Sequence, residues 1–451
     1  MGRQSQRLIM VMPAVARGRE EFLSLSHSPW KTDDWFVSPW NFAGEATSGL
    51  RPPATLRIHD ETLRDGEQQP GIVFTQDDKV RIAEKLAEAG IHRIEAGTPA
   101  ASPYDEAAVK EIVKRRLGPQ IFVLGRCSID DVKRAVDCGV DGVSLELPAS
   151  QHLIEHAYRW TTEKATDLAI GATRYAHEQG LYVSFGPVDA SRSDMGQLLK
   201  LVRRVASEGH MDGLALVDTY GVLSPHGASY YTRMMRECVN KPLEIHFHNN
   251  FGLAAANTVM AVLEGGEVVH STVTGIGEGG GNCPMIEVVM TLRILYGVDA
   301  GIRYELLQEL SDMVTALAGR LPNHPFVGEE SYDVESGTVV TWHRNCRKRY
   351  PTDVMPVVPS LVGHREPRYV MGKLSGLASI AIWAGDLDIA LSSEQQAEVL
   401  RRVKQCANSV KRQLSEDEFR RIADDVKARG EATPGEAAAK QARDARDSQR
   451  Q

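Results

Sequence analysis

The chain has 451 residues, of which 42% are hydrophobic and 25% are charged, a composition typical of a globular protein with one large domain and a smaller one. A formal net charge of −8 excludes the strongly basic balance of a nucleic-acid-binding protein. Six cysteines without a CxxC pair predict reduced thiols in a cytoplasmic protein. No apolar run approaches the roughly 18 residues that a membrane span needs, so we expect no membrane partner.

The first 50 residues predict an extension ahead of the main domain. Residues 3–18 have the outline of a secretion signal, but their apolar run is short and contains Pro13, so a floppy or misassigned start is favoured. The aromatic-rich residues 30–42 are expected to be ordered, packing over the main domain or a partner subunit.

Short β-rich runs then alternate with helical segments, and this rhythm predicts the fold. One such helical segment, residues 75–90, is opened by the N-cap candidate Thr75 and closed by Gly90. The eight β-rich runs cover residues 55–60, 92–97, 121–126, 142–147, 181–186, 213–218, 243–248 and 268–275. Eight βα repeats predict an α/β protein with a closed (β/α)8 TIM barrel, whose chemistry lies at the carboxyl ends of the strands. An open doubly wound sheet is the alternative, weakened because no G-x-G-x-x-G follows the first strand.

The predicted division of the chain has four parts. After the extension comes a barrel over residues 51–301, then a smaller helical C-terminal subdomain over residues 302–430 with amphipathic helices. The last residues, 431–451, are polar and predict a disordered tail.

The segment "HFHNN" (246–250) suggests a metal site. His246 and His248 end the seventh predicted strand, and side chains two residues apart in a strand share a face. In a closed barrel they would meet Asp65 after strand 1 and Asn282 after strand 8, because these strands are neighbours. Imidazole, carboxylate and amide ligands with open positions suit a catalytic divalent cation such as Mn, Zn or Co, and Mg is also compatible. The ordinary alternative is a pair of histidines that neighbouring groups satisfy.

Three motifs then resemble a known family. The segments "DETLRDGEQ" (60–68), "HFHNNFG" (246–252) and "GIGEGGGN" (275–282) are similar to the metal-dependent acyltransferases and lyases of the DRE-TIM metallolyase superfamily. This superfamily includes isopropylmalate, homocitrate and citramalate synthases and hydroxymethylglutaryl-CoA lyase. The resemblance covers about residues 50–300, and a weaker likeness continues to about residue 430. It implies a cytoplasmic enzyme of amino-acid biosynthesis, commonly a homodimer, that uses 2-oxo acid and acyl-CoA substrates.

Residue roles follow from the same resemblance. It makes Arg64 the catalytic arginine, and it gives the metal ligands as Asp65, His246, His248 and Asn282. It assigns substrate-binding positions to Gln68, Glu95, Arg126 and Thr219. A 2-oxo acid chelates a cation through its carboxylate and keto oxygens, while a permanently charged arginine stabilises the developing alkoxide. Arg126 is suited to bind a distal carboxylate; a surface salt bridge or a supporting rim contact is the ordinary alternative for each of these side chains.

The chain also departs from the family pattern. Val188 stands where the synthases have a glutamate that takes part in deprotonating acetyl-CoA, and Val334 and Val339 stand near where they have histidines. Glu146, at the end of strand 4, and His343 are candidate replacements for the lost acid–base groups, and Glu146 is the candidate catalytic base. The ordinary alternative for either is a salt bridge or a rim contact.

Three functions remain on this basis. The first is condensation of an acyl-CoA, acetyl-CoA above all, with a 2-oxo acid, as in isopropylmalate or homocitrate synthase. A lyase or aldolase that cleaves a hydroxyacyl-CoA or a 4-hydroxy-2-oxo acid is the alternative, and a catalytically decayed binding subunit is another. The space after residue 301 is too short for the extra regulatory domain of many isopropylmalate synthases, so homocitrate-synthase-like architecture without leucine feedback is expected.

Overall fold

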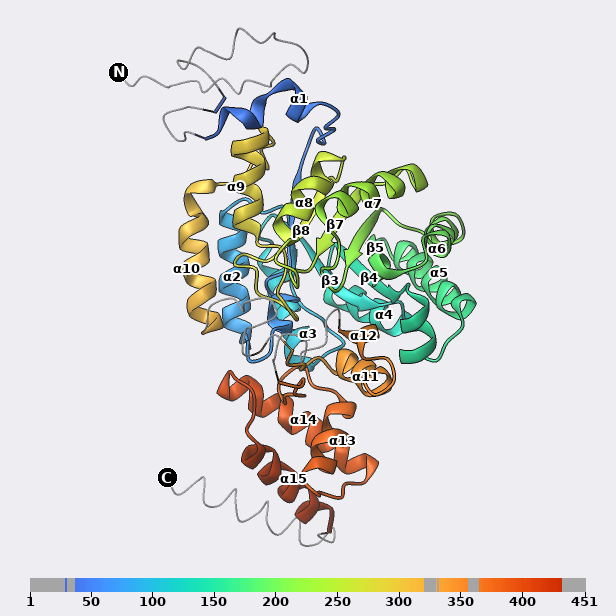
Figure 1. Ribbon diagram of the computed structural model, residues 1–451. Coiled ribbons are helices and arrows are strands. Elements are labelled where there is room, and N and C mark those ends of the chain that lie inside the picture. Colours follow the sequence, from blue (N-terminus) through green and yellow to red (C-terminus); the bar gives the residue numbers. More distant parts are fainter. Residues whose placement is uncertain (1–28, 31–36, 320–329, 331, 356–364, 432–451) are drawn as a thin grey trace, which may run out of the picture.

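The computed structural model describes residues 29–30, 37–319, 330, 332–355 and 365–431. It confirms the predicted closed barrel (Figure 1). The parallel strands follow one another in chain order, and β8 pairs back onto β1. The strands are β1 (Arg57–Asp60), β2 (Arg93–Glu95), β3 (Gln120–Arg126), β4 (Gly142–Pro148), β5 (Tyr182–Val188), β6 (Gly213–Asp218), β7 (Leu243–Phe247) and β8 (Val268–Ser271). Each overlaps one predicted run, although several ends differ, so the sequence pattern located every strand.

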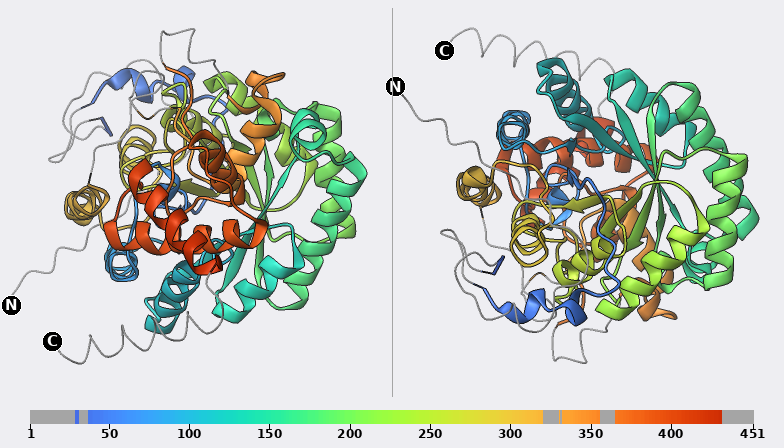
Figure 2. Two further views of the ribbon diagram at one scale, coloured as in Figure 1. Left: turned by 90° about the horizontal axis from the view of Figure 1, so that it is seen from below. Right: turned by 90° about the horizontal axis from the view of Figure 1, so that it is seen from above.

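Helices surround the barrel and connect its strands (Figure 2). Thr75 caps the first of them as predicted, because its hydroxyl accepts from Asp78 N while the Asp78 carboxylate accepts from Thr75 N. The barrel helices are α2 (Gln76–Glu88), α3 (Pro103–Arg115), α4 (Ile129–Cys138), α5 (Thr162–Glu178), α6 (Met195–Glu208), α7 (Pro225–Cys238), α8 (Ala254–Leu263), α9 (Met285–Tyr296) and α10 (Leu307–Ala318). Shorter helical turns are η2 (Pro39–Phe42), α1 (Gly44–Thr47), η3 (Gly66–Gln68), η4 (Leu153–Ala157), η5 (Ala190–Arg192) and η6 (Tyr304–Leu306).

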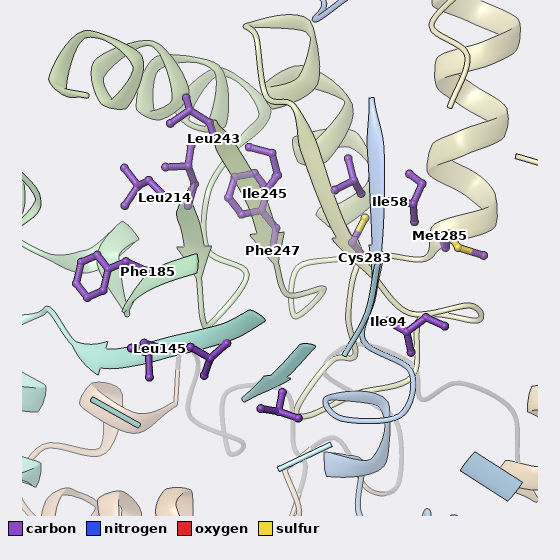
Figure 3. Close-up of a cluster of buried hydrophobic side chains, with 14 of the residues drawn as sticks. Ile58, Ile94, Leu145, Phe185, Leu214, Leu243, Ile245, Phe247, Cys283 and Met285 are labelled. Carbon is purple, nitrogen blue, oxygen red and sulfur yellow. The ribbon is translucent and has the colours of Figure 1, made fainter. Parts of the chain in front are cut away.

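One apolar cluster fills the space between strands and helices. Figure 3 shows part of it, with Phe185, Leu243 and Met285 among the labelled side chains. Buried residues of α10, including Leu310 and Val314, belong to the same cluster. This helix therefore packs as part of the barrel, although it lies beyond residue 301, where the sequence pattern places the end of that domain; the division into domains stays a prediction.

The remaining helices form a subdomain that covers the carboxyl ends of the barrel strands (Figures 1 and 2). Its own core contains Val399, Val403 and Phe419. The helices are α11 (Gly337–Cys346), α12 (Pro351–Val354), α13 (Leu377–Asp386), α14 (Ser393–Val410) and α15 (Glu416–Glu431). The predicted helical C-terminal region is thus confirmed, and it lies where a barrel carries its chemistry.

A separate apolar cluster joins this subdomain to the barrel rim. Val188 at the end of β5 and Leu153 of η4 pack with Val340 and Trp342 of α11. Because these side chains are buried between the two parts, they hold the subdomain over the rim.

The N-terminal extension is described only in part. Trp30 is buried and its ring lies 6.0 Å from that of Phe42, whereas Trp40 is exposed. The signal-like residues 3–18 and the predicted tail from residue 432 onward lie outside the described residues. Within the described part of the chain, no helix has the length and apolar character that a membrane crossing requires.

Replacing Val340 with alanine is expected to destabilise the protein by about 1–3 kcal/mol, because it leaves a cavity at a fully buried position between subdomain and rim. Urea unfolding measures this change. The matched control is Ile129→Ala on the surface of α4, which is expected to stay within about 0.5 kcal/mol of the parent. Parent-like unfolding of Val340→Ala would contradict the role of this contact.

Candidate metal centre

The end of β7 presents two imidazoles to the interior of the barrel rim. Glu244, His246 and His248 alternate along this segment and therefore share the inward face. The Nε2 atoms of His246 and His248 are 3.2 Å apart. Asp65, in the loop after β1, places its Oδ2 atom 3.8 Å from the first of these nitrogens and 3.9 Å from the second. The structure thus brings together the three side chains that the strand order predicted to meet.

The contacts and spacing of this cluster fit a cation. The Nδ1 atom of His246 lies 2.8 Å from Glu61 Oε2, and a proton on that nitrogen leaves the Nε2 lone pair facing His248 and Asp65. Ligand atoms about 2.1 Å from one ion are roughly 3.0 Å apart in octahedral and 3.4 Å apart in tetrahedral coordination. The observed separations of 3.2–3.9 Å need only a slight contraction to reach that range. The donor set of nitrogen and oxygen atoms therefore fits a divalent metal.

A buried network below the cluster fixes His246. Glu61 bridges His246 and His270, whose Nδ1 atom lies 2.8 Å from Glu61 Oε1. The other nitrogen of His270 lies 3.0 Å from Glu244 Oε2, and Glu244 Oε1 accepts from Arg93 Nη1 at 2.9 Å. Burial lowers the pKa of His270, but the two flanking carboxylates outweigh it and raise the value to about 10. His270 is therefore a cation at neutral pH, and it holds Glu61 in place next to His246, one of the candidate metal ligands.

Arg64 closes the other side of the site. Its guanidinium donates to Glu61 Oε1 at 2.9 Å and to Asp65 Oδ2 at 2.6 Å, and it also binds Glu95. A fourth hydrogen bond runs from Nη1 to Gln68 Oε1 at 3.1 Å. An arginine has five N–H donors, so these contacts within the described part of the chain leave one donor for a substrate oxygen. Burial would raise the pKa of Asp65, but Arg64 and His248 hold it below its usual value.

The glycine-rich loop after β8 approaches the cluster closely. Asn282 Nδ2 donates to Asp65 Oδ1 at 2.7 Å. Gly277 has a φ of +156°, and a Cβ atom there would lie 2.1 Å from Asn282 Nδ2. Only glycine permits this approach. The amide of Asn282 thus orients Asp65, whereas its role as a metal ligand stays a prediction.

Glu146 faces the same space from the opposite side of the barrel. It shares the inward face of β4 with Ser144 and lies one step nearer the rim. Among the described residues its carboxylate has no hydrogen-bond or ion-pair partner. Burial raises the pKa of Glu146, although Arg64 opposes the shift. It is therefore a carboxylate held near the site with its proton affinity increased.

The structure places the predicted substrate-binding residues in different surroundings. Gln68 and the fully buried Glu95 contact Arg64, so they lie at the cluster. The Thr219 hydroxyl accepts from Asp189 N at 2.7 Å. The Arg126 side chain is two-thirds exposed and forms a bidentate salt bridge with Asp131, and not with the residues of the candidate metal site. Binding of substrate by each of the four stays a prediction.

The valines that depart from the family pattern meet in one place. Val188, Val334 and Val339 all belong to the apolar cluster between rim and subdomain. His343 lies beside it, with Nε2 at 3.1 Å from Val354 O, and burial lowers its pKa to about 4. His343 is thus neutral and engaged with the backbone, which does not favour it as a replacement base.

Sequence reasoning missed the groups that hold the cluster from below. A signal for them exists, because strands of a parallel barrel are buried on both faces and rarely carry charged residues. Glu244 precedes His246 by two residues in such a strand, and His270 lies within β8. Glu61 is part of the "DETLRDGEQ" motif itself. Reading these charges as inward-facing would have predicted the network.

Fold and cluster together define a TIM-barrel protein with a candidate divalent-metal site at the carboxyl-terminal rim. The sequence profile of the family described as HMGL-like matches residues 55–314, more than half of the chain. The chain belongs to this family.

Three relatives with similar sequences are named as synthases. The chain is 35% identical to the homocitrate synthase AksA of Methanothermobacter thermautotrophicus over 87% of its own length and 98% of the relative. It is 39% identical to a probable 2-isopropylmalate synthase of Methanopyrus kandleri, over 80% of the chain and 71% of the relative. It is 38% identical to the (R)-citramalate synthase CimA of Methanocaldococcus jannaschii, over 78% of the chain and 70% of the relative.

Solved structures agree with the fold. The HMG-CoA lyase of Bacillus subtilis superposes with a TM-score of 0.55 at 18% identity, covering 60% of this chain and 97% of the lyase. The hydroxymethylglutaryl-CoA lyase of Pseudomonas aeruginosa gives a TM-score of 0.54 at 22% identity, covering 60% and 95%. At these identities the likeness establishes the barrel architecture alone.

Replacing Glu61 with glutamine is expected to weaken Mn²⁺ binding about 10- to 100-fold, because the carboxylate that contacts Nδ1 of His246 and orients its ring is lost. Isothermal titration calorimetry on the full chain measures the change. Glu88→Gln, at an exposed salt bridge with Lys85, is the control and is expected to bind like the parent. Unchanged affinity in Glu61→Gln would show that Glu61 does not orient the ligand.

Proposed function

We propose that the protein joins an acyl-CoA, acetyl-CoA above all, to a 2-oxo acid with the help of a divalent metal. One observation carries the proposal: a buried carboxylate and two imidazoles face one another within 3.9 Å beside a buried arginine. Homology to synthases at 35–39% identity supports the same reaction class. We propose Asp65, His246 and His248 as ligands, with Asn282 as a further one, and Mn, Mg, Zn or Co as the cation.

The site residues divide the chemistry of bond formation between them. A bound cation would supply Lewis acidity to the keto group of the 2-oxo acid. Removal of a proton from the α-carbon of the thioester gives an enolate, which forms a carbon–carbon bond to the keto carbon. The keto oxygen then becomes an alkoxide. Arg64 stabilises this negative charge through its remaining N–H donor, and hydrolysis of the thioester releases the CoA thiol.

Glu146 is our candidate for the base that takes the proton. Its carboxylate lies on the inner face of the rim, has no partner among the described residues, and is influenced electrostatically by Arg64 and His246. A carboxylate with a raised pKa accepts a proton more readily near neutral pH. The proton that it takes returns to the alkoxide through solvent.

Substrate binding is proposed for the remaining predicted positions. Gln68 and Glu95 would act through Arg64, which both contact. Arg126 would need to leave Asp131 to bind a distal carboxylate, and Thr219 would need to offer its hydroxyl proton while accepting from Asp189.

The alternative function is cleavage by a lyase or aldolase of the same family. The observation that favours it is the apolar contact around Val188, which leaves no ionisable side chain at that position. Retro-aldol cleavage removes a proton from a hydroxyl group and not from carbon, so it asks for a base in a different place.

A substrate panel separates these functions. The purified chain with Mn²⁺ or Mg²⁺ is incubated with acetyl-CoA and a series of 2-oxo acids, and free thiol is followed. We expect thiol release that depends on both the metal and the acceptor. Silence with every acceptor, together with 2-oxo acid release from 4-hydroxy-2-oxo acids or cleavage of hydroxyacyl-CoAs, would replace the synthase by the lyase. Tight metal binding without either activity would support a binding subunit.

Replacing Glu146 with glutamine is expected to lower kcat by roughly 10²-fold or more, because a glutamine amide cannot accept the proton. In the parent, activity should fall as the pH drops through the raised pKa of Glu146, since the base is then protonated. Steady-state kinetics across pH measures both effects. Glu155→Gln, an exposed carboxylate on η4, is the control and should keep parent kinetics. Parent-like turnover in Glu146→Gln would remove this residue from the mechanism.

A further inference from the structure

A second cluster of buried charges lies beside the metal centre. It contains two lysines and two carboxylates, all at most 2% exposed at the side chain: Lys79, Lys373, Glu67 and Asp105. Lys79 Nζ lies 2.9 Å from both Glu67 Oε2 and Asp105 Oδ1. Lys373 Nζ lies 2.6 Å from Glu67 Oε1 and 3.2 Å from Asp105 Oδ1. Ammonium and carboxylate groups thus alternate, and each cation contacts both anions.

Burying such a cluster contributes little net free energy to the stability of a protein. Lysine is almost never fully buried, and the desolvation of buried ion pairs offsets much of their attraction, so apolar side chains of similar volume are often as stabilising. Removing one partner leaves an uncompensated buried charge. Stability alone therefore does not account for the cluster, and its position in the fold becomes the informative feature.

The cluster brackets the loop that carries Arg64 and Asp65. On one side, Lys79 Nζ donates to Leu63 O at 2.8 Å. On the other side, Glu67 follows Asp65 by two residues within η3, and its carboxylate also accepts from Phe74 N at 2.8 Å. Both ends of the short segment that bears the metal-binding carboxylate are thus tied to the same four charges.

Lys373 is the one member of the four that comes from the C-terminal subdomain. A tight turn presents it: Gly372 N donates to Ser375 Oγ at 2.9 Å, and Glu335 accepts from Leu374 N at 2.9 Å. The turn is joined to the rest of the subdomain by the bridge between Met371 and Leu414. The subdomain therefore contacts the loop that carries Arg64 and Asp65 through the ammonium group of Lys373, and the hydrogen bonds of this turn hold that lysine.

We propose that Lys373 is a positioning residue through which the C-terminal subdomain sets the geometry of the metal centre. Its contact with Glu67 holds η3, and η3 in turn holds Asp65 opposite the two imidazoles and Arg64 beside Glu61. Docking of the subdomain and formation of a tight metal site are thereby coupled. This inference rests on the proposed metal site, and not on the identity of the reaction.

The test compares two lysines of the C-terminal subdomain, each of which contacts a carboxylate of the barrel. Lys373→Met removes the buried contact, whereas Lys411→Met removes the half-exposed pair with Asp78 on α2 and leaves the metal loop untouched. Mn²⁺ binding to the full-length variants is measured by electron paramagnetic resonance, and folding is followed by urea unfolding. We expect Lys373→Met to bind Mn²⁺ about 10- to 100-fold more weakly, and Lys411→Met to stay within twofold of the parent.

A double variant separates positioning from loss of charge balance. Lys373→Met with Asp105→Asn leaves one ammonium and one carboxylate, so it is expected to unfold like the parent even if Lys373→Met alone does not fold. Weak Mn²⁺ binding in this folded double variant supports the proposal, and parent-like binding overturns it. If the parent binds Mn²⁺ but turns over no substrate pair, the proposed reaction fails while this comparison still stands.

Discussion

The structure depends on three electron-pair donors that are made to face one another at the barrel rim. Two imidazole nitrogens and the Asp65 carboxylate lie within 3.9 Å of one another, where lone pairs repel unless a cation lies between them. Closure of the barrel imposes this meeting, because β7, β8 and β1 are consecutive neighbours. Neighbouring polar groups keep these donors in place. Glu61 contacts His246, and Arg64 and Asn282 each donate a hydrogen bond to the Asp65 carboxylate.

Much of this could be predicted from the sequence because its physical causes are local. The alternation of β-rich runs with capped helices located every strand, and the alternation of side chains in "HFH" predicted that His246 and His248 share a face. What could not be predicted depends on contacts between distant segments. Whether Arg126 points at the site or pairs with Asp131 is decided by rotamers. That Lys373 reaches Glu67 requires the placement of a whole subdomain.

The three valines share one apolar environment, although they are far apart in the sequence. Val188, Val334 and Val339 come from the rim and from the subdomain, yet they are buried in one apolar cluster. Burying a glutamate among these apolar side chains would cost free energy that an apolar side chain does not. The three valines are therefore best understood together, as one contact that is apolar on both sides. Such a contact stabilises the covering subdomain, and the valines themselves cannot take part in proton transfer.

The carboxylates around the centre consequently differ in character because their neighbours differ. Burial opposes ionisation of Glu61, but His246 and Arg64 hold its pKa well below its usual range, so it stays an anion that orients its neighbours. Burial raises the pKa of Glu278, in the glycine-rich loop after β8, to about 8, and it raises that of Glu146 in the same direction. Among the described residues, neither carboxylate has an ion-pair partner. Two carboxylates with different proton affinities in one site can take different roles. The anionic group suits a structural task, and the groups that hold protons more tightly suit proton transfer. Because Val188 itself cannot exchange a proton, the proposed proton transfer rests on Glu146, the carboxylate that β4 supplies on the inner face of the rim.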